Sequence, residues 1–353
     1  MKRSKMFPAV FFFCILLLGA GIFINTRGRH DSDAPPPKPD PVPELKGALA
    51  VIIENHPNSR PQSGLENADI VYEMVSEGNI TRLLALYYWE AAEKIGPTRS
   101  VRPYMVEIAK AYHAPLAHAG GSADGLQAIR TLKMPNLDEI HNASRYFWRS
   151  DQRRMPHNLY TSTDLLLEGA EAKNYEMTPL AALPEREDNQ SEDYDLEESE
   201  DVSLYDEPAE YIDVVYSTSS RSPYATQYYF HEERYFKFVN NEPFLSDLDI
   251  PITADNVIVL IIPTGREIKD GETYADIKLL GSGQAVFFSK GEMALGTWQK
   301  SSPSDHFSYY IGNEPAYFSS GKTWVHIVPN VSSLTYRAEA DTHPFFKEND
   351  ENN

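Results

Sequence analysis

The sequence predicts a fold of mixed class, α/β or α+β, in which an N-terminal α/β layer domain is followed by a mostly β C-terminal domain. In residues 46–180, short apolar or alternating runs alternate with helix-like segments that begin at serine or threonine. In residues 211–335, strand-like runs are separated by Gly, Pro, Asn and Asp clusters, and no long helical period competes. Alternation of strands and helices is typical of α/β layers, whereas successive strands indicate a β-rich domain.

The first half is expected to contain strands and helices in turn. Short runs rich in apolar, β-branched or aromatic residues predict strands at "ALAVIIE", "DIVYEMVSEG", "TRLLALYYWEA" and "APLAHAG". Hydroxyl residues at possible N-caps predict helices: Ser100 before "VRPYMVEIAKAY", Ser122 before "ADGLQAIRTL", and Ser162 or Thr163 before "DLLLEGAEAK".

The second half is expected to consist of strands. They are predicted at "YIDVVYS", "TQYYFHEERYFKFV", "DNVIVLIIPT", "GQAVFFSKG", "EMALGTWQK" and "KTWVHIVP". "SKGEMA" predicts a hairpin turn, and "FSSGKTW" a loop before a strand. The many aromatic residues favour core and cross-strand packing, with a sugar-stacking platform as the alternative. A polar tail follows at 336–353.

The N-terminal residues 1–30 predict a membrane anchor. Three basic residues precede an uncharged apolar run from Phe7 to Ile24. As a helix of 1.5 Å rise per residue, this run would be about 27 Å long, which is enough to cross the hydrocarbon core of a bilayer. The alternative is a signal peptide cleaved near "GAG" at 19–21. Either interpretation places the rest of the chain outside the cytoplasm, on a proline-rich stalk at 31–45.

The single cysteine limits the chemistry of the exported part. Cys14 lies within the apolar run, so the rest of the chain has no disulfide, no thiol nucleophile and no cysteine metal ligand. No HExxH, GxSxG or phosphate-loop signature appears either. We therefore predict neither a cofactor nor a bound metal.

Most of the net charge of −20 comes from one segment. Residues 185–210 hold thirteen acids and one arginine. Such a run repels itself and buries little, so 181–210 is interpreted as an acidic linker or loop; binding of calcium or of a partner is the alternative. The remaining sequence shows no basic face that would neutralise phosphates, which argues against a nucleic-acid partner.

Polar residues at the ends of two predicted strands are candidate ligand contacts. The first strand leads into "NHPNSRPQSG", which supplies Asn55, His56, Arg60 and Gln62. The segment "HAGGS" supplies His118, Gly120, Gly121 and Ser122. In α/β sheets, ligands gather beyond the carboxyl ends of parallel strands, and glycine amides with a helix N-terminus favour an anion. The structural alternatives are a polar turn for His56 and a hydrogen-bonded core histidine for His118.

Arginines and a second histidine segment extend this candidate site. Arg99 and Arg102 flank a predicted helix start, where two guanidiniums could converge on one carboxylate or phosphate. Arg82, Arg149, His157 and Asn158 complete the set of candidate contacts. Pairing with surface acids would explain the arginines without a ligand. We expect Asn55, Arg99, Arg102, His118 and His157 to face one cleft, because strand ends and helix starts share an edge of the sheet.

At these segments a family resemblance is visible. "NHPNSRPQSGLENADIVYEMVSEGNITRLLALYYWE", "GPTRSVRPY", "HAGGS", "FWR", "PHNLYTS", "GTWQK" and "GKTWVHIVP" resemble, in this order, the YerB-like lipoprotein family of Gram-positive bacteria. The resemblance covers nearly all of the chain after the stalk. It implies two domains outside the membrane and no established activity. One departure concerns Cys14, which lacks the small preceding residue of a lipobox and favours a transmembrane anchor over lipidation.

Two classes of function follow. The first is a cell-envelope protein whose arginines bind an anionic envelope ligand, or a protein partner with an acidic segment. The second is a cell-wall hydrolase or transglycosylase-like enzyme, in which Glu73 or Glu77 is the acid or base, His118 or His157 transfers the proton, and the "HAGGS" amides stabilise an oxyanion. Alternation places Glu73 and Glu77 beside valines, where a half-apolar environment would raise a carboxyl pKa.

Overall fold

The computed structural model describes residues 45, 47–180, 205–219, 223–269, 272–341 and 343–350. All of them belong to one compact unit, Val42–Asn353. The expected anchor at 1–30, most of the stalk and most of the acidic segment lie outside the described residues. Among the helices of the described part, none is both long and apolar enough to cross a bilayer.

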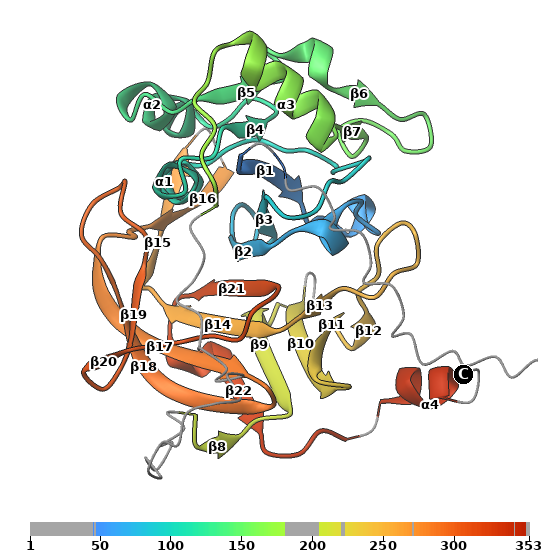
Figure 1. The fold of residues 1–353 in the computed structure, drawn as a ribbon, viewed down its shortest axis with the longest axis vertical. Coiled ribbons are helices and arrows are strands. Elements are labelled where there is room, and N and C mark those ends of the chain that lie inside the picture. The colour runs from blue at the N-terminus through green and yellow to red at the C-terminus, as the bar shows by residue number, and fades with distance from the viewer. Residues whose placement is uncertain are drawn as a thin grey trace, which may run out of the picture. The chain divides into compact units, whose positions relative to one another are not determined.

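A twelve-stranded sheet combines strands from both halves of the chain (Figure 1). Its order is β20-β19-β18-β17-β14-β21-β2-β3-β1-β4-β5, and β8 pairs with β18. The first half supplies β1 (Leu49–Glu54), β2 (Ile70–Val75), β3 (Thr81–Tyr87), β4 (Leu116–His118) and β5 (Asn136–Asp138). The second half supplies β8 (Glu207–Pro208), β14 (Asn256–Ile261), β17 (Gly281–Ser289), β18 (Glu292–Lys300), β19 (Ser308–Ile311), β20 (Glu314–Pro315) and β21 (Thr323–Val328).

The two halves meet where β2 pairs with β21. This pairing is parallel and runs from Ile70 opposite Thr323 to Met74 opposite Ile327. Strand β21 is also parallel to β14, and β1, β4 and β5 are parallel to one another. Strand β3 is antiparallel to both β1 and β2. The sheet is therefore mixed, and its central seam is made of residues from opposite ends of the described chain.

Smaller elements surround this sheet. A six-stranded sheet contains β9 (Tyr211–Ser217), β10 (Tyr224–His231), β11 (Arg234–Val239), β12 (Glu242–Pro243), β13 (Thr253–Ala254) and β22 (Leu334–Arg337). Two hairpins are formed by β6 (Trp148–Arg149) with β7 (Leu159–Tyr160), and by β15 (Thr264–Lys269) with β16 (Glu272–Ile277). The helices are α1 (Pro103–Ala111), α2 (Ala123–Thr131), α3 (Thr163–Ala172) and α4 (Pro344–Asp350).

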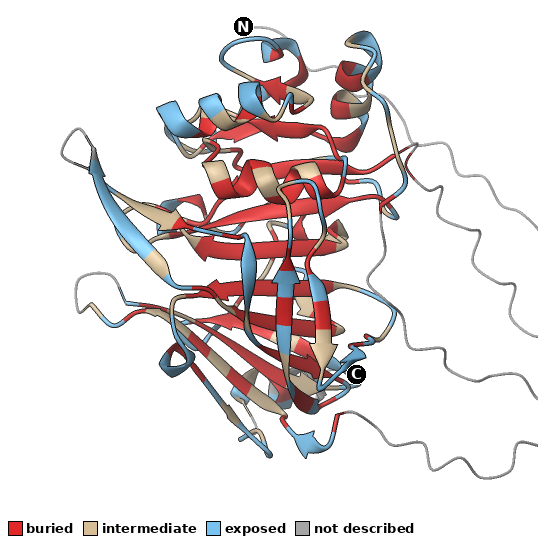
Figure 2. Ribbon diagram, turned by 90° about the vertical axis from the view of Figure 1, so that its left-hand side faces the viewer, coloured by how far each residue is buried: buried red, intermediate tan, exposed pale blue. Residues whose placement is uncertain are grey.

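Two apolar cores lie on opposite faces of the large sheet, because successive side chains of a strand alternate in direction. Ile52 of β1 packs in one core with residues of α1 such as Val106 and Ile108. Val51 packs in the other core with Leu166 of α3 and with residues of the six-stranded sheet. Each core contains residues of both halves, and Figure 2 shows buried residues concentrated in the strands of the large sheet.

The predicted fold class is confirmed: the first half contains strands and helices, and the second is mostly β. Ser122 and Ser162 cap α2 and α3, and each hydroxyl accepts a hydrogen bond from the backbone amide of the third helical residue, Gly125 or Leu165. The prediction for Ser100 is wrong, since α1 begins after Arg102 and the Ser100 hydroxyl donates instead to the Ala119 carbonyl. Pro103 at the first helical position needs no amide partner, which explains the later start.

Candidate functional site

The parallel strands β1, β4 and β5 end at one edge of the large sheet. Their last residues are Glu54, His118 and Asp138. The segments "NHPNSRPQSG" and "HAGGS" therefore begin at the same edge, as the parallel arrangement requires. Glu54 and Asp138 are both buried acids, so the edge carries carboxylates as well as the expected basic groups.

The Glu54 carboxylate contacts two of the predicted side chains. Its Oε1 lies 3.1 Å from Nε of Arg99, and its Oε2 lies 2.9 Å from Nδ1 of His157. The His157 ring stacks on His56, with 4.9 Å between ring centroids. Burial and the neighbouring His157 lower the pKa of His56. The carboxylate thus neutralises Arg99 and orients His157, in the manner of an acid that fixes an imidazole.

The remaining residues of the first loop form an internal network. Arg60 donates to the side-chain and backbone oxygens of Asn55, and its guanidinium lies 5.1 Å from the ring centroid of Tyr224. Gln62 donates to the Asn55 side chain and to the Glu54 carbonyl. These polar groups hold the loop in one conformation, which is a structural use of "NHPNSRPQSG".

Arg149 and Asn158 lie on the β6–β7 hairpin. Arg149 Nη1 donates to Asn158 Oδ1 at 3.2 Å, and its Nη2 lies 3.3 Å from Oε1 of Glu139. Asn158 also donates to the Ser150 carbonyl. Arg149 is therefore paired with an acid that follows β5.

Hydrogen bonds to neighbouring protein groups hold the "HAGGS" segment in place. His118 Nδ1 lies 2.8 Å from the Gly120 carbonyl, and the Gly120 amide donates to Asp138 Oδ1 at 2.8 Å. The Ser122 amide donates to the Val101 carbonyl. Burial lowers the pKa of His118, which is fully buried. Two of the amides expected to face an oxyanion are thus already paired, and Gly121 packs its backbone against Val101.

Glu73 lies in a fully buried network that joins the two halves. Its Oε2 is 2.9 Å from Nζ of Lys237, and both side chains are 0% exposed. Its Oε1 accepts from Thr81, Asn55 and Tyr224. Burial alone would raise the pKa of Glu73, but the charge of Lys237 and the Tyr224 hydrogen bond outweigh burial and lower it to about 2. The carboxylate is ionised and closed to a substrate.

Aromatic and imidazole groups complete the shell of this ion pair. His326 contacts the hydroxyl of Tyr216 through Nδ1 and that of Tyr228 through Nε2, each at 2.8 Å. The Lys237 ammonium lies 4.0 Å from the ring centroid of Trp324. Burial lowers the pKa of His326 to about 3, so the ring is neutral at physiological pH. Each charged or polar atom thus finds a partner, which a buried ion pair requires.

Arg82 and Arg102 share one carboxylate, that of Glu77, which follows β2. Arg82 Nη2 lies 2.8 Å from Glu77 Oε2, and Arg102 contacts Oε1. Arg102 also lies over the ring of Tyr274 on β16. Two guanidiniums thus contact one carboxylate.

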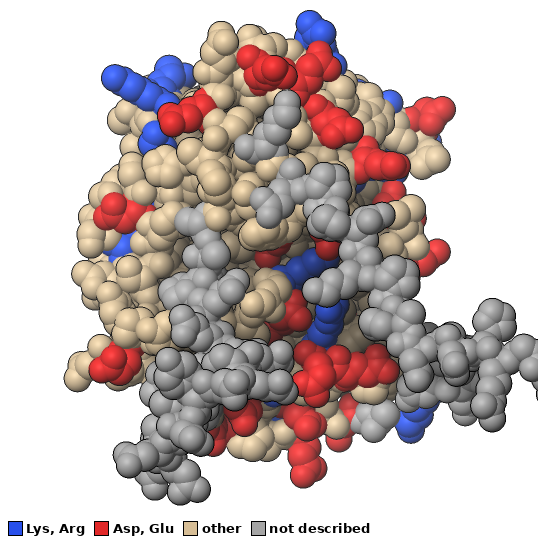
Figure 3. Space-filling view, viewed as in Figure 1, with Lys and Arg blue, Asp and Glu red and all other residues tan. Residues whose placement is uncertain are grey.

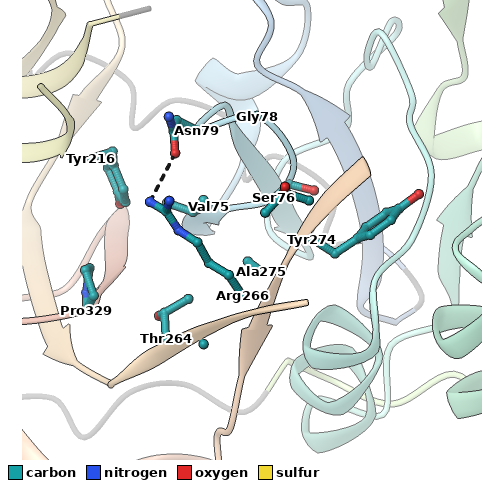
Figure 4. Close-up of a pocket in the computed structure, with 12 residues that line it drawn as sticks. Val75, Ser76, Gly78, Asn79, Tyr216, Thr264, Arg266, Tyr274, Ala275 and Pro329 are labelled. Atoms are coloured by element: carbon teal, nitrogen blue, oxygen red, sulfur yellow. Dashed lines mark hydrogen bonds between the residues drawn. The ribbon is translucent and has the colours of Figure 1, made fainter. Parts of the chain in front are cut away.

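A cavity of about 240 Å³ opens next to this cluster, between the β2–β3 turn, β9 and the β15–β16 hairpin. Figure 4 shows the Arg266 side chain crossing it toward Asn79, with the Tyr274 ring extending away from Arg266. The distance from Arg266 Nη2 to Asn79 Oδ1 is 3.5 Å. Within the described part of the chain, no carboxylate is paired with Arg266. Tyr216, whose hydroxyl contacts His326, forms one wall.

Apart from Arg149 and Asn158 on the β6–β7 hairpin, the predicted residues fall into four neighbourhoods. Arg99 and His157 meet at Glu54, and Arg82 and Arg102 meet at Glu77. The other two neighbourhoods are the Glu73 network with Asn55, and the His118–Asp138 pair. The 240 Å³ cavity is lined by different residues, and Arg99 and Arg102 contact different carboxylates. Among the described residues, no group of three His, Cys, Asp or Glu is placed to hold a metal.

Several residues of these clusters were not predicted from the sequence. Glu54 and Asp138 are each the last residue of a buried strand, a signal that points to the same edge as His118. Lys237 and His326 interrupt the apolar runs "RYFKFV" and "TWVHIV", where a buried polar residue needs a partner elsewhere. Arg266 gave no comparable signal, because it lies in an ordinary exposed hairpin strand.

Both halves of the chain match known protein families. Residues 37–176 match the family model "Protein of unknown function (DUF3048) N-terminal domain", and residues 212–325 match the corresponding C-terminal domain. The chain is 28% identical to "Putative lipoprotein YerB" of Bacillus subtilis (strain 168) over 293 residues, which cover 81% of this chain and 82% of that protein. It is also similar to the crystal structure of YerB from Bacillus subtilis, with a TM-score of 0.72 and 26% identity, over 83% of this chain and 94% of the other.

Proposed function

This chain belongs to the YerB-like family with two DUF3048 domains, and on that premise we propose that it is an extracytoplasmic envelope protein that binds an anionic ligand in the Arg266 cavity. Residues 1–30 would hold it at the membrane as an uncleaved apolar segment. The ligand class would be a carboxylate or phosphate, as in peptidoglycan stem peptides, teichoic acids or an acidic segment of a protein partner.

The observation that carries this proposal is the pairing of the arginines. Arg99 and Arg149 are each paired with a carboxylate, and Arg82 and Arg102 share that of Glu77. Arg60 binds the Asn55 oxygens and Tyr224. Arg266 lies on the cavity and is bound to an amide oxygen, and its guanidinium can accept an anion in a bidentate geometry.

The surroundings of the cavity also favour an anion. Glu77 lies between Ser76 and Gly78, both of which line it, and its carboxylate is outnumbered by two guanidiniums. Thr273, Asn79 and Ser76 add neutral polar groups to the wall. A pocket that combines a few convergent polar groups with aromatic walls is typical of a small-ligand site.

The hydrolase alternative has weaker support. Glu73 is ionised and enclosed, and His118 is fully buried, so neither reaches a substrate in this conformation. The Glu54–His157 pair is more accessible, but an oriented imidazole alone defines no reaction. We therefore favour binding over catalysis.

Binding is tested by titrating the full-length chain, kept in detergent, with inorganic phosphate and with soluble muropeptides that carry stem carboxylates. We expect binding that Arg266→Gln weakens about tenfold or more, because a charge-assisted hydrogen bond is lost. Arg145→Gln is the matched control, since Arg145 is an exposed arginine on η3 (Ser144–Tyr146). Equal affinity of the Arg266→Gln and wild-type proteins for both probes would refute this site.

The anchor is tested separately by cell fractionation. We expect the full chain to stay with membranes at high salt, and Cys14→Ser to leave this unchanged, because the apolar run rather than a lipid would hold it. Release by Cys14→Ser would show lipidation. A soluble wild-type product that begins after Gly21 would show a cleaved signal peptide.

A further inference from the structure

A second cavity, of about 320 Å³, lies where the start of β2 and the end of β3 meet the loop before β21. Its lining includes Asp69, Trp89, Glu90, Ser320 and Lys322. None of these residues lines the Arg266 cavity. The volume is at the lower end of the range for small-ligand sites, which suits a single ring of a larger molecule.

Trp89 presents an exposed aromatic face in a fixed orientation. Its side chain is 49% exposed although Trp is usually covered in folded proteins. Tyr88 packs edge-on against the Trp89 ring, with 4.9 Å between centroids, and the Trp89 amide donates to Asp69 Oδ2. A large apolar ring held in place beside polar groups is a typical platform for a ligand with both apolar and polar surface.

The polar groups around Trp89 offer both donors and acceptors. Asp69 Oδ2 accepts the amides of Tyr88 and Trp89, and no hydrogen bond within the described residues uses its Oδ1. Lys322 lies 3.6 Å from the Glu90 carboxylate and also contacts the Glu66 carbonyl. Burial raises the pKa of Asp69 to about 6. At neutral pH the carboxylates of Asp69 and Glu90 therefore face the single ammonium of Lys322.

The loop on the far side of the cavity is built independently of any ligand. The Lys322 amide donates to Asp255 and the Ser319 amide donates to Asn256. Gly321 has a φ of 121°, and a Cβ at this position would overlap the Asp255 carboxylate. Only glycine fits here without strain. The loop holds Ser320 exposed at the cavity, where its hydroxyl adds a further polar group.

We propose that this cavity binds a pyranose ring of a glycan, with the apolar face of the sugar on Trp89 and its hydroxyls on Asp69, Glu90 and Ser320. Sugar C–H groups would cover the exposed indole face, and hydroxyls can donate to carboxylates and accept from Lys322. An ammonium ligand would also fit an aromatic ring beside acids, but the Lys322 ammonium already lies against the Glu90 carboxylate and would repel a second cation there. This site is separate from the anion site and stands without it.

The test uses the full-length protein in a polyoxyethylene detergent, because a sugar-headed detergent would compete. Chitotetraose and cellotetraose are the saccharide probes, and tetramethylammonium is the cation probe. We expect at least one saccharide to bind, and Trp89→Ala to weaken it about tenfold or more while Trp89→Tyr retains part of the affinity. Trp148→Ala is the matched control, since Trp148 is also exposed at 36%. Thermal denaturation confirms that each variant is folded.

Three outcomes would overturn the proposal. One is the absence of saccharide binding at millimolar concentration by the wild type, and another is an equal loss of affinity in Trp89→Ala and Trp148→Ala. The third is binding of tetramethylammonium, lost in Trp89→Ala, without binding of either saccharide. Arg266→Gln should leave saccharide affinity unchanged, whereas it weakens phosphate binding. Failure of the anion proposal is therefore distinguishable from failure of this one.

Discussion

Glu73 and Glu77 come from one short segment, "DIVYEMVSEG", yet the fold uses the two carboxylates differently. Glu73 lies within β2 and is completely buried, and within the described part of the chain its cationic partner is Lys237. Glu77 follows the strand, has a side chain 22% exposed and contacts two arginines. In the interior, one carboxylate of Glu73 faces one ammonium of Lys237, whereas Glu77, beside a cavity, faces two guanidiniums. Sequence alternation alone does not separate these roles.

The difference indicates which region is available for function. A buried ion pair with every polar atom satisfied contributes specificity to the seam between the halves and offers no atom to a ligand. A partly exposed cluster with unbalanced charge creates a local field that attracts an anion. On the face drawn in Figure 3, basic and acidic side chains are interspersed, so local pairing rather than overall charge defines such a site.

The largest effect is expected from Lys237→Met. Removing the ammonium leaves Glu73 charged and buried without its partner, which should lower the free energy of unfolding by about 3–5 kcal/mol. Urea denaturation measures the loss. The double variant Glu73→Gln, Lys237→Met is the control and should recover part of the stability, since no buried charge remains. A loss below 1 kcal/mol in Lys237→Met would mean that the pair is not buried.

The pH dependence of stability should show the second largest effect. His326 has a folded-state pKa of about 3 against 6.5 for a free histidine. As pH falls below 6.5 the unfolded chain takes up a proton that the folded chain refuses, so stability falls by up to about 1.4 kcal/mol per pH unit. Below pH 4.5, Glu73 adds to this loss as pH approaches its folded pKa of about 2.

Urea denaturation of the wild type and His326→Phe at pH 7, 6 and 5 isolates this contribution. The variant should lack the part of the slope due to His326. Asp69, with its pKa raised to about 6, acts in the opposite direction in both proteins and cancels in the difference. Identical slopes in the two proteins would argue against a neutral, buried His326.

Glu77→Gln should have a smaller effect on stability and a distinctive effect on binding. The variant leaves Arg82 and Arg102 with a neutral partner, which should cost about 1–3 kcal/mol of unfolding free energy. The same change removes the carboxylate that both arginines contact, so phosphate affinity should rise severalfold. Calorimetric titration with phosphate provides the measurement, and weaker binding by a folded Glu77→Gln protein would contradict the anion site.

The smallest effect is expected at an exposed ion pair. Arg145 and Glu168 are 3.1 Å apart, with side chains 74% and 55% exposed. Glu168→Gln should change the free energy of unfolding by less than about 0.5 kcal/mol, because water screens the pair. Urea denaturation of Glu168→Gln and Lys237→Met compares the loss of stability at an exposed ion pair with that at a buried one. A loss comparable to that of Lys237→Met would remove burial as the explanation of the difference.

The sequence predicted the elements better than their assembly. Strands such as Tyr211–Ser217 and Glu292–Lys300 match their predicted runs, because apolar alternation and turn residues are local signals. Ser122 was identified as a cap for the same reason. The pairing of β2 with β21 could not be predicted, because no residue pattern in either strand specifies the strand with which it pairs.

Only part of the candidate site could be predicted from the sequence. The shared edge of β1 and β4 follows from parallel pairing, and the structure places Glu54 and His118 there. Which carboxylate each arginine meets depends on side chains brought in by other elements, as when Arg102 finds Glu77 and Tyr274. Arg266 is visible as a candidate only after its neighbours are placed.

The β2–β21 pairing also has a consequence for biogenesis. Its partners are about 250 residues apart in sequence, so the contact order at the middle of the large sheet is high. A chain threaded across a membrane from its N-terminus would expose β2 well before β21 emerges, with an unpaired edge and half of each core uncovered. Completion of the sheet would have to wait until nearly the whole polypeptide had been translocated. A chaperone outside the membrane, or fast export, would then protect the waiting N-terminal half from aggregation.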